Sequence, residues 1–331
     1  MPELIMIHAH VDLRTERFSQ FIKSIPFIAA LLQGWDLAKI GYQNKGPSYR
    51  RKQQWKAVYH VFFNYKFSLT WFDTLVAAEY SFIFKLRPRL YIKPFRTYIS
   101  TRWSKEKKLK VIFDSYRFMK SKQAVFSQLV NENKNAVLAH FPLDEENIAS
   151  LVLGYDDQFR KEGEVVLSLE CEQLGGRLVS VAFSFEEVEE NKWVCWVGCV
   201  QGHSLKNMGK ATKSVQKLMH GLRPNSFIMT ALQDLCRSLG CTAIYCVADS
   251  HHSYRKKHAV HLPWRHTIGF DYDGFWLEVG AQKEAGDWFN LPLLRARKEM
   301  PEIKTKKRAM YRKRYAMLDE MALNISDAVN G

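Results

Sequence analysis

The segment HGLRPN at residues 220–225 stands directly before a predicted helix and offers the clearest chemistry in the sequence. His220 carries a side chain that can act as a general base near neutral pH. An arginine at a helix N-terminus can hold a phosphate with both arms of its guanidinium, and the backbone N–H groups there attract anions. We therefore predict that Arg223, Asn225 and Ser226 hold the phosphate of a donor. The alternative is that the segment only caps the helix and orients the loop.

A group of histidines follows the predicted strand at residues 242–248. The segment DSHHSYR at residues 249–255 lies at the carboxyl end of that strand, where ligands of open sheets tend to bind. We predict that His252 belongs to a pocket there. A metal site is the alternative, but no H-E-x-x-H motif or fixed ligand spacing occurs, so no metal is predicted. The other histidines of this group are His251, His258, His261 and His266.

The acidic and aromatic segment DYDGFWLE at residues 271–278 is a third candidate. Asp271 or Glu278 could orient a histidine that acts as a base, and the aromatic rings could wall a pocket for an acyl chain or a lipid. We predict that residues 269–279 form a strand. The alternative to a pocket wall is packing of aromatic strand residues with a tight Asp-Gly turn.

A basic run at residues 304–315 holds seven cations in twelve residues. On a helix these side chains cover most of the circumference, and phosphates are their natural partners: anionic lipid headgroups, an acidic protein or nucleic acid. Nucleic acid is the weakest of the three, because the sequence has no recognisable nucleic-acid-binding motif. The alternative is a solvated charged surface. The predicted contacts are Lys304, Lys306, Lys307, Arg308 and Arg312.

The elements that must position these residues follow from the spacing of apolar side chains. Strands are predicted at residues 164–170, 178–185 and 193–200, with a charged turn at 186–191, and they form an antiparallel meander. Residues 226–239 have helical spacing between Pro224 and Gly240, and a strand follows at 242–248. This helix is predicted to be a crossover packed on the sheet. Residues 305–329 are predicted to be helical.

The N-terminal part differs in composition. Residues 53–86 are dense in aromatic side chains, which indicates helices packed into a core or, alternatively, a surface that enters the bilayer interface. Residues 85–96 contain two prolines, which argues against a continuous helix. A polar cluster at residues 131–135 is the predicted boundary. The fold class is therefore α+β, with a mostly helical, aromatic- and basic-rich region over residues 1–135 and an α/β domain over residues 136–331 that ends in the basic helix.

Composition limits the class of protein. The 331 residues are 47% apolar and 25% charged, which is typical of a folded soluble protein. The formal net charge of +15 favours an acidic partner. None of the six cysteines stands in a C-x-x-C pair, which indicates buried free thiols in a reducing compartment. No signal peptide or membrane span is predicted, so we expect a cytoplasmic protein, peripheral to the inner membrane at most.

The order strand, strand, strand, loop, helix, glycine, strand resembles the centre of GNAT acyltransferases. In that fold the loop before the helix binds a pyrophosphate, and here HGLRPN stands in its place without the usual Gly-x-Gly. Toxin-activating acyltransferases depart from the pattern in a similar way and take acyl chains from acyl carrier protein. The resemblance implies a donor that is a thioester of acyl carrier protein or coenzyme A, and an acidic carrier suits a chain of charge +15.

Several motifs in their expected order resemble the VirK/YbjX family of bacterial proteins. They are KPFRTY at 93–98, WVGCVQG at 196–202, HGLRP at 220–224, DYDGFW at 271–276, LP at 291–292 and KKRAMYR at 306–312. The resemblance implies a role in virulence, envelope remodelling or resistance to cationic antimicrobial peptides. The leading hypothesis is an acyltransferase in which Arg223 holds the donor phosphate, His220 or His252 is the base and Asp271 orients it. The alternatives are a non-enzymatic adaptor that binds an anionic surface through the basic helix, or a nucleic-acid-binding protein.

Overall fold

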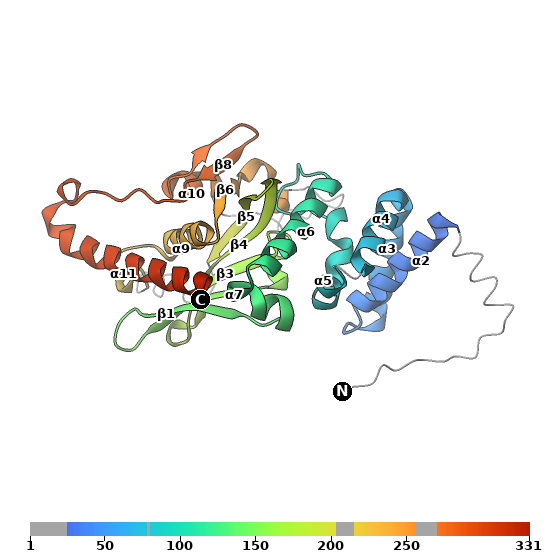
Figure 1. Ribbon diagram of the computed structural model, residues 1–331, viewed down its shortest axis with the longest axis horizontal. Coiled ribbons are helices and arrows are strands. Elements are labelled where there is room, and N and C mark those ends of the chain that lie inside the picture. The colour runs from blue at the N-terminus through green and yellow to red at the C-terminus, as the bar shows by residue number, and fades with distance from the viewer. Residues whose placement is uncertain (1–24, 78–79, 203–214, 256–269) are drawn as a thin grey trace. The chain divides into compact units, whose positions relative to one another are not determined.

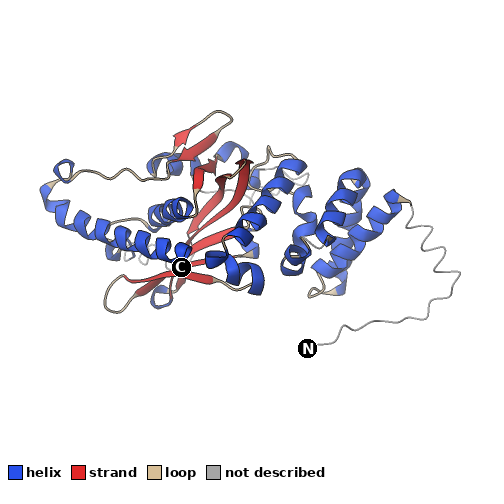
Figure 2. Ribbon diagram, viewed as in Figure 1, coloured by secondary structure: helices blue, strands red, loops and turns tan. Residues whose placement is uncertain are grey.

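A computed structural model describes residues 25–77, 80–202, 215–255 and 270–331 of the chain (Figure 1). His258, His261 and His266 lie outside the described residues. The chain packs as two compact units, Met1–Phe95 and Arg96–Gly331. The class is α+β, as predicted, because helices precede a mixed eight-stranded sheet and further helices (Figure 2).

The described part of the first unit is helical. Its helices are α2 (Pro26–Gly41), α3 (Pro47–Phe63), α4 (Tyr65–Val76) and α5 (Ser81–Leu86), followed by the 3-10 helix η1 (Pro88–Phe95). The prolines of residues 85–96 do prevent a continuous α-helix. The buried Trp71 donates its indole N–H to the carbonyl oxygen of Tyr91 at 2.8 Å, which ties α4 to η1.

The aromatic side chains of this unit divide between core and surface. Trp71 and Phe72 on α4 are fully buried. By contrast, the exposed fractions of Trp55, Tyr59 and Phe63 on α3 exceed 60%. The prediction of helices is confirmed, and part of the aromatic content packs in the core while another part faces solvent.

The second unit is built on a sheet with strand order β1-β2-β3-β4-β5-β6-β8-β7. The strands are β1 (Ala136–Pro142), β2 (Ile148–Gly154), β3 (Val165–Cys171), β4 (Gly176–Glu189), β5 (Lys192–Gly202), β6 (Cys241–Val247), β7 (Gln282–Lys283) and β8 (Trp288–Leu291). The predicted antiparallel meander is β3-β4-β5 and is confirmed. All six cysteines are buried free thiols, as predicted.

The predicted crossover is also confirmed. Helix α9 (Pro224–Ser238) leads into β6, which pairs with β5 in parallel, and Gly240 ends the helix with a φ of +82°. Strand β5 pairs with β6 from Trp193 to Val197, whereas its pairing with β4 extends to Gly202. Helix α11 (Thr305–Asn330) packs on α9 and β1. Helices α6 (Lys105–Ser121) and α7 (Gln123–Ser127) precede the sheet, and α6 packs on β4.

Two of the predicted elements are wrong. The segment predicted as a strand at residues 269–279 contains helix α10 (Tyr272–Glu278), because Asp271 caps it and its aromatic residues follow helical spacing. The turn predicted at residues 186–191 is shorter, because β4 continues to Glu189. Glu186 is buried in that strand, where its carboxylate accepts hydrogen bonds from Lys107 and from the indole of Trp196.

Candidate functional site

The N-terminus of α9 carries the predicted phosphate-binding residues. Arg223 is the N-cap residue and Pro224 is the first residue of the helix, which suits its fixed φ. The guanidinium of Arg223 is exposed and contacts both carboxylate oxygens of Glu278 on α10 at 2.9 Å. Asn225 is half-buried, and Ser226 is buried with its carbonyl oxygen bonded to the hydroxyl of Thr230. Arg223 therefore holds a carboxylate at the place where a phosphate was predicted.

His220 lies beside the basic helix α11. Its φ is +52°, and the φ of the following Gly221 is +76°, so the chain turns sharply before α9. The guanidinium of Arg314 donates two hydrogen bonds to the carbonyl oxygen of His220, at 2.8 and 3.1 Å. Burial and then the charges of Lys313 and Arg314 lower the pKa of His220. His220 and Arg314 are thus in contact although they are 94 residues apart in the sequence, a pairing that the sequence analysis did not predict.

His252 follows β6 and the short 3-10 helix η5 (Asp249–His251), beyond the carboxyl end of the strand. It is 2% exposed, and its ring lies parallel to that of Tyr272 with 4.8 Å between centroids. Nε2 must donate its proton to the carbonyl oxygen of Gly198 at 2.7 Å, because a carbonyl oxygen only accepts. Nδ1 of the neutral ring is consequently an acceptor, and it accepts a long hydrogen bond from the backbone N–H of Tyr254 at 3.4 Å. Burial lowers the pKa of His252 to about 4, so the ring is neutral at pH 7.

Asp271 does not contact His252 but caps α10. Its Oδ1 accepts a hydrogen bond from the backbone N–H of Gly274 at 2.9 Å. The carboxylate whose charge acts on His252 belongs to Asp249, which also accepts from the backbone N–H of Tyr272 at 3.1 Å. The sequence could have indicated this carboxylate, because Asp249 is the first residue of the DSHHSYR segment that contains His252.

His251 has a different role from its neighbour. Its Nε2 donates to the carbonyl oxygen of Asp287 at 2.8 Å, so its Nδ1 accepts from the hydroxyl of Ser100 at 2.9 Å. The side chain therefore joins two distant segments of the second unit. Within the described part of the chain, no three His, Cys, Asp or Glu side chains are placed to hold a metal ion.

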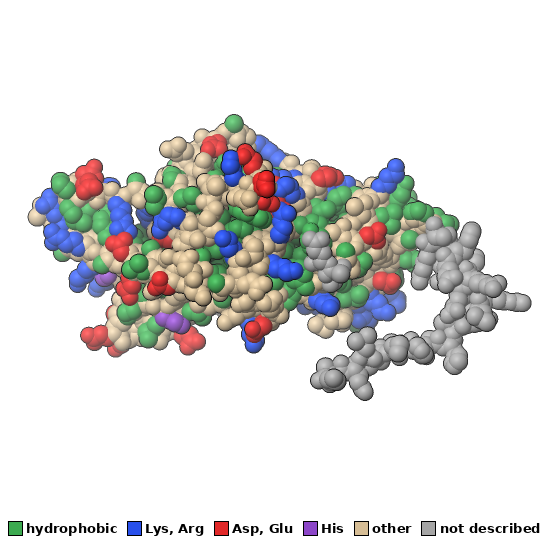
Figure 3. All heavy atoms as spheres, in the orientation of Figure 1, with side chains coloured by type: hydrophobic (Ala, Val, Ile, Leu, Met, Phe, Trp, Pro, Cys, Tyr) green, Lys and Arg blue, Asp and Glu red, His purple; other side chains and the backbone are tan. Residues whose placement is uncertain are grey.

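The predicted partner residues lie on the first turns of α11. Lys304, Lys306, Lys307 and Arg312 are exposed. Arg308 is half-buried and donates to the carbonyl oxygen of Ile303 at 3.0 Å. Figure 3 shows Lys and Arg side chains gathered at the end of the second unit where α11 begins. None of the described helices is both long and apolar enough to cross a membrane.

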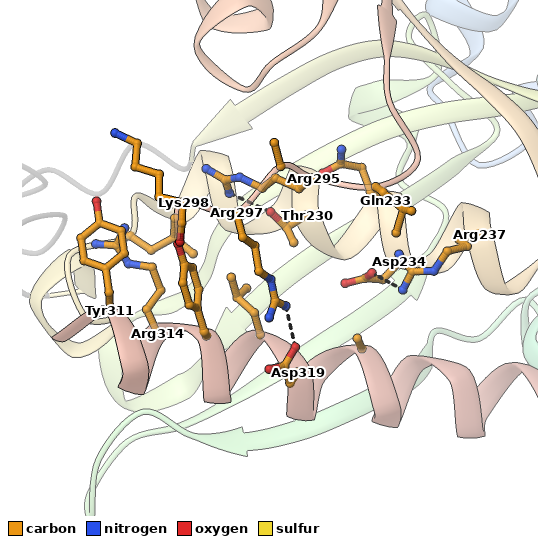
Figure 4. A pocket seen from close by; sticks show the side chains of 16 residues that line it. Thr230, Gln233, Asp234, Arg237, Arg295, Arg297, Lys298, Tyr311, Arg314 and Asp319 are labelled. Carbon is orange, nitrogen blue, oxygen red and sulfur yellow. Dashed lines mark hydrogen bonds and ion pairs between the residues drawn. The ribbon is translucent and has the colours of Figure 1, made fainter. Parts of the chain in front are cut away.

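The sequence interpretation missed a basic cavity between α9, α11 and residues 294–298. Arg237 on α9 and Arg314 on α11 line it together with Arg295, Arg297 and Lys298 (Figure 4). The sequence feature that could have indicated this cavity is the short cationic run RARK at residues 295–298. The run has no periodicity, so it predicted neither an element nor a site.

Comparison with known proteins gives relatives without an assigned activity. The model of a family described as proteins of unknown function, DUF535, matches residues 47–327. An uncharacterised protein of Haemophilus influenzae is 31% identical over 231 residues, which are 69% of this chain and 74% of that protein. The uncharacterised protein YbjX of Escherichia coli K12 is 28% identical over 250 residues, 74% of this chain and 73% of YbjX. No solved structure matches.

Proposed function

The chain belongs to the DUF535 family, which bears out the VirK/YbjX resemblance, and from that premise we propose that it is an acyltransferase with its reaction centre at the carboxyl ends of β5 and β6. The observation that carries the proposal is His252. This neutral, oriented imidazole lies where two parallel strands joined by a crossover helix separate, which is where open sheets bind ligands.

His252 is the base of the proposed reaction. The acceptor displaces the long hydrogen bond from the Tyr254 N–H to Nδ1. Nδ1 then takes a proton from the hydroxyl or amine of the acceptor as the oxygen or nitrogen of that group attacks the thioester carbonyl carbon. The bond between that carbon and sulfur breaks, and the proton passes to the leaving thiolate. The Gly198 carbonyl fixes the tautomer, and the negative charge of Asp249 stabilises the imidazolium that forms. Such general-base help is worth roughly 10²–10⁴ in rate.

The donor is a thioester of acyl carrier protein or coenzyme A. Its phosphate replaces Glu278 on Arg223, because an exposed ion pair contributes at most about 1 kcal/mol and opens readily. The order β5, α9, β6 supports this placement through its likeness to GNAT acyltransferases. We place the acceptor in the cell envelope, as the family's association with envelope remodelling, virulence and resistance to antimicrobial peptides implies.

Native mass spectrometry with acyl-loaded and unloaded acyl carrier protein tests the donor. We expect a complex that favours the loaded carrier and is weakened by Arg223→Ala. Arg160→Ala is the matched control, because Arg160 is also an exposed arginine paired with a carboxylate. Acyl transfer from the loaded carrier should fall at least about 100-fold in His252→Gln. The absence of a complex with either carrier, or an equal loss in both arginine variants, contradicts the proposal.

A second candidate is a non-enzymatic adaptor that binds an anionic membrane surface. The exposed cations Lys306, Lys307 and Arg312 favour it, since they extend from one helix into solvent. Anionic headgroups attract such clusters by about 1 kcal/mol per cation near the surface.

A further inference from the structure

The basic cavity is built from three segments of the second unit. Helix α9, helix α11 and residues 294–298 enclose about 350 Å³, which is within the range of small-molecule pockets. Figure 4 shows arginine side chains entering it from all three segments. Part of its wall is apolar, formed by Leu222, Leu294 and Leu318. The cavity can therefore accommodate an organic body as well as a charged group.

The charges of the cavity are unbalanced. Five cationic and two acidic side chains line it, which gives a net charge of +3. Asp234 pairs with Arg237 at 2.6 Å, and Asp319 pairs with Arg297 at 2.5 Å. Both carboxylates are thus already occupied. Among the described residues, Arg295 and Arg314 form their hydrogen bonds with uncharged oxygens.

These two guanidinium groups are held in place. Arg295 is half-buried and donates to the hydroxyl of the buried Thr230 at 2.9 Å. Arg314 donates to the carbonyl oxygen of His220 and lies 4.2 Å from the centroid of the Tyr311 ring. Burial and then the charge of Arg314 lower the pKa of Arg295. Fixed like charges in one cavity repel each other, and a bound anion would remove that repulsion.

We infer that this cavity binds the phosphate group of a small organic phosphate monoester through Arg295 and Arg314, with Lys298 at its rim. A monoester carries a charge of about −1.5 to −2, which compensates several cations better than a carboxylate does. Planar guanidinium forks match the geometry of phosphate oxygens. The inference does not depend on acyl transfer, because none of these side chains belongs to the proposed reaction centre.

Isothermal titration calorimetry of the full chain in chloride buffer of constant ionic strength tests the site. The soluble probe is glycerol 3-phosphate, and glycerol is the uncharged control. We expect glycerol 3-phosphate to bind and glycerol not to bind. Arg295→Gln and Arg314→Gln should each weaken binding by about 10- to 100-fold, because each removes charge-assisted hydrogen bonds. Arg295→Lys should retain part of the affinity, because it keeps the charge without the fork.

Arg160→Gln is the matched control, since Arg160 is an exposed arginine of the second unit that does not line the cavity. The melting temperature of Arg295→Gln in phosphate-free buffer should equal or exceed that of the wild type, because a repulsive charge is removed. This measurement also shows that the variant is folded.

A second arm separates a free metabolite from a lipid headgroup. Vesicles with phosphatidic acid present a phosphate monoester, whereas vesicles with phosphatidylglycerol present a diester at matched lipid fraction. Binding of glycerol 3-phosphate supports a soluble ligand. Preference for phosphatidic acid that is lost in Arg295→Gln/Arg314→Gln, without binding of glycerol 3-phosphate, supports a lipid phosphate. The inference is overturned if neither glycerol 3-phosphate nor phosphatidic acid binds, or if Arg160→Gln loses as much binding as the cavity variants.

Discussion

At the scale of single residues, burial sets the behaviour of His252. The ring has lost nearly all of its contact with water, and its Nε2 proton is committed to the Gly198 carbonyl. A protonated ring would have to be desolvated, which burial opposes more strongly than Asp249 can offset. The imidazole is therefore kept neutral over the whole physiological pH range.

We expect the ring protons of His252 to titrate near pH 4 in NMR spectra, below the usual value of about 6.5. Because the unfolded chain binds this proton at higher pH, the histidine lowers the free energy of unfolding as the pH falls from about 6.5 to 4. The loss is about 3 kcal/mol. His252→Asn should flatten that part of the stability curve. Titration near 6.5 would contradict the buried, oriented ring.

The position of Gly198 is equally constrained. A Cβ atom there would lie 2.0 Å from the carbonyl oxygen of Glu162, so backbone would have to move. We expect Gly198→Ala to lower the free energy of unfolding by about 3 kcal/mol and to shift the titration of His252, since its acceptor moves. Gly46→Ala is the control, because no atom lies within 4 Å of its added Cβ. Equal stability of the two variants in urea denaturation would disprove the close approach.

At the scale of elements, α10 is a short helix whose cap, Asp271, was predicted from the sequence to orient a catalytic histidine. Asp271 bonds the backbone N–H of Gly274, and three aromatic residues, Tyr272, Phe275 and Trp276, are buried at helical spacing. The indole N–H of Trp276 donates to the carbonyl oxygen of Val247 at 2.9 Å, which fixes α10 against β6. The helix thereby positions Tyr272 against His252.

Asp271 can be tested as a cap separately from its predicted role beside a histidine. Asp271→Ala should lower the free energy of unfolding by about 1 kcal/mol, and Asp271→Asn should cost less, because asparagine also caps helices well. The titration of His252 should be the same in Asp271→Asn as in the wild type. A shift of that titration would assign Asp271 an electrostatic role that the hydrogen bonds do not show.

The elements that periodicity predicted are those with a single apolar stripe or a regular alternation. Helix α9 and the β3-β4-β5 meander are of this kind. The segment of α10 was misread because dense aromatic residues also favour strands. Glu186 was predicted in a turn because a charged residue is usually exposed. Its burial in β4 depends on Lys107 and Trp196, whose proximity the sequence does not show. Arg295 was missed for the same reason, since its cavity is formed only by tertiary packing.

At the scale of the whole molecule, the net charge of +15 by itself attracts any anionic surface. The second unit adds a local arrangement, because exposed cations of α11 are concentrated on its first turns. Long-range attraction by total charge is screened by salt, and a local cluster at contact distance is screened less. Two variants that lose the same number of positive charges, one on α11 and one elsewhere, can therefore distinguish binding through α11 from unspecific attraction by the net charge.

Cosedimentation with phosphatidylglycerol vesicles makes that distinction. Lys306→Ala/Lys307→Ala/Arg308→Ala and Lys39→Ala/Lys45→Ala/Arg51→Ala each remove three positive charges, the second set from exposed positions of the first unit. If α11 is the contact, the first variant should lose about 3 kcal/mol of binding, at about 1 kcal/mol per cation, while the second stays near wild type. Wild-type binding should weaken as salt is raised. An equal loss in both variants would mean that total charge alone drives the association, and the adaptor function would then have no site on α11.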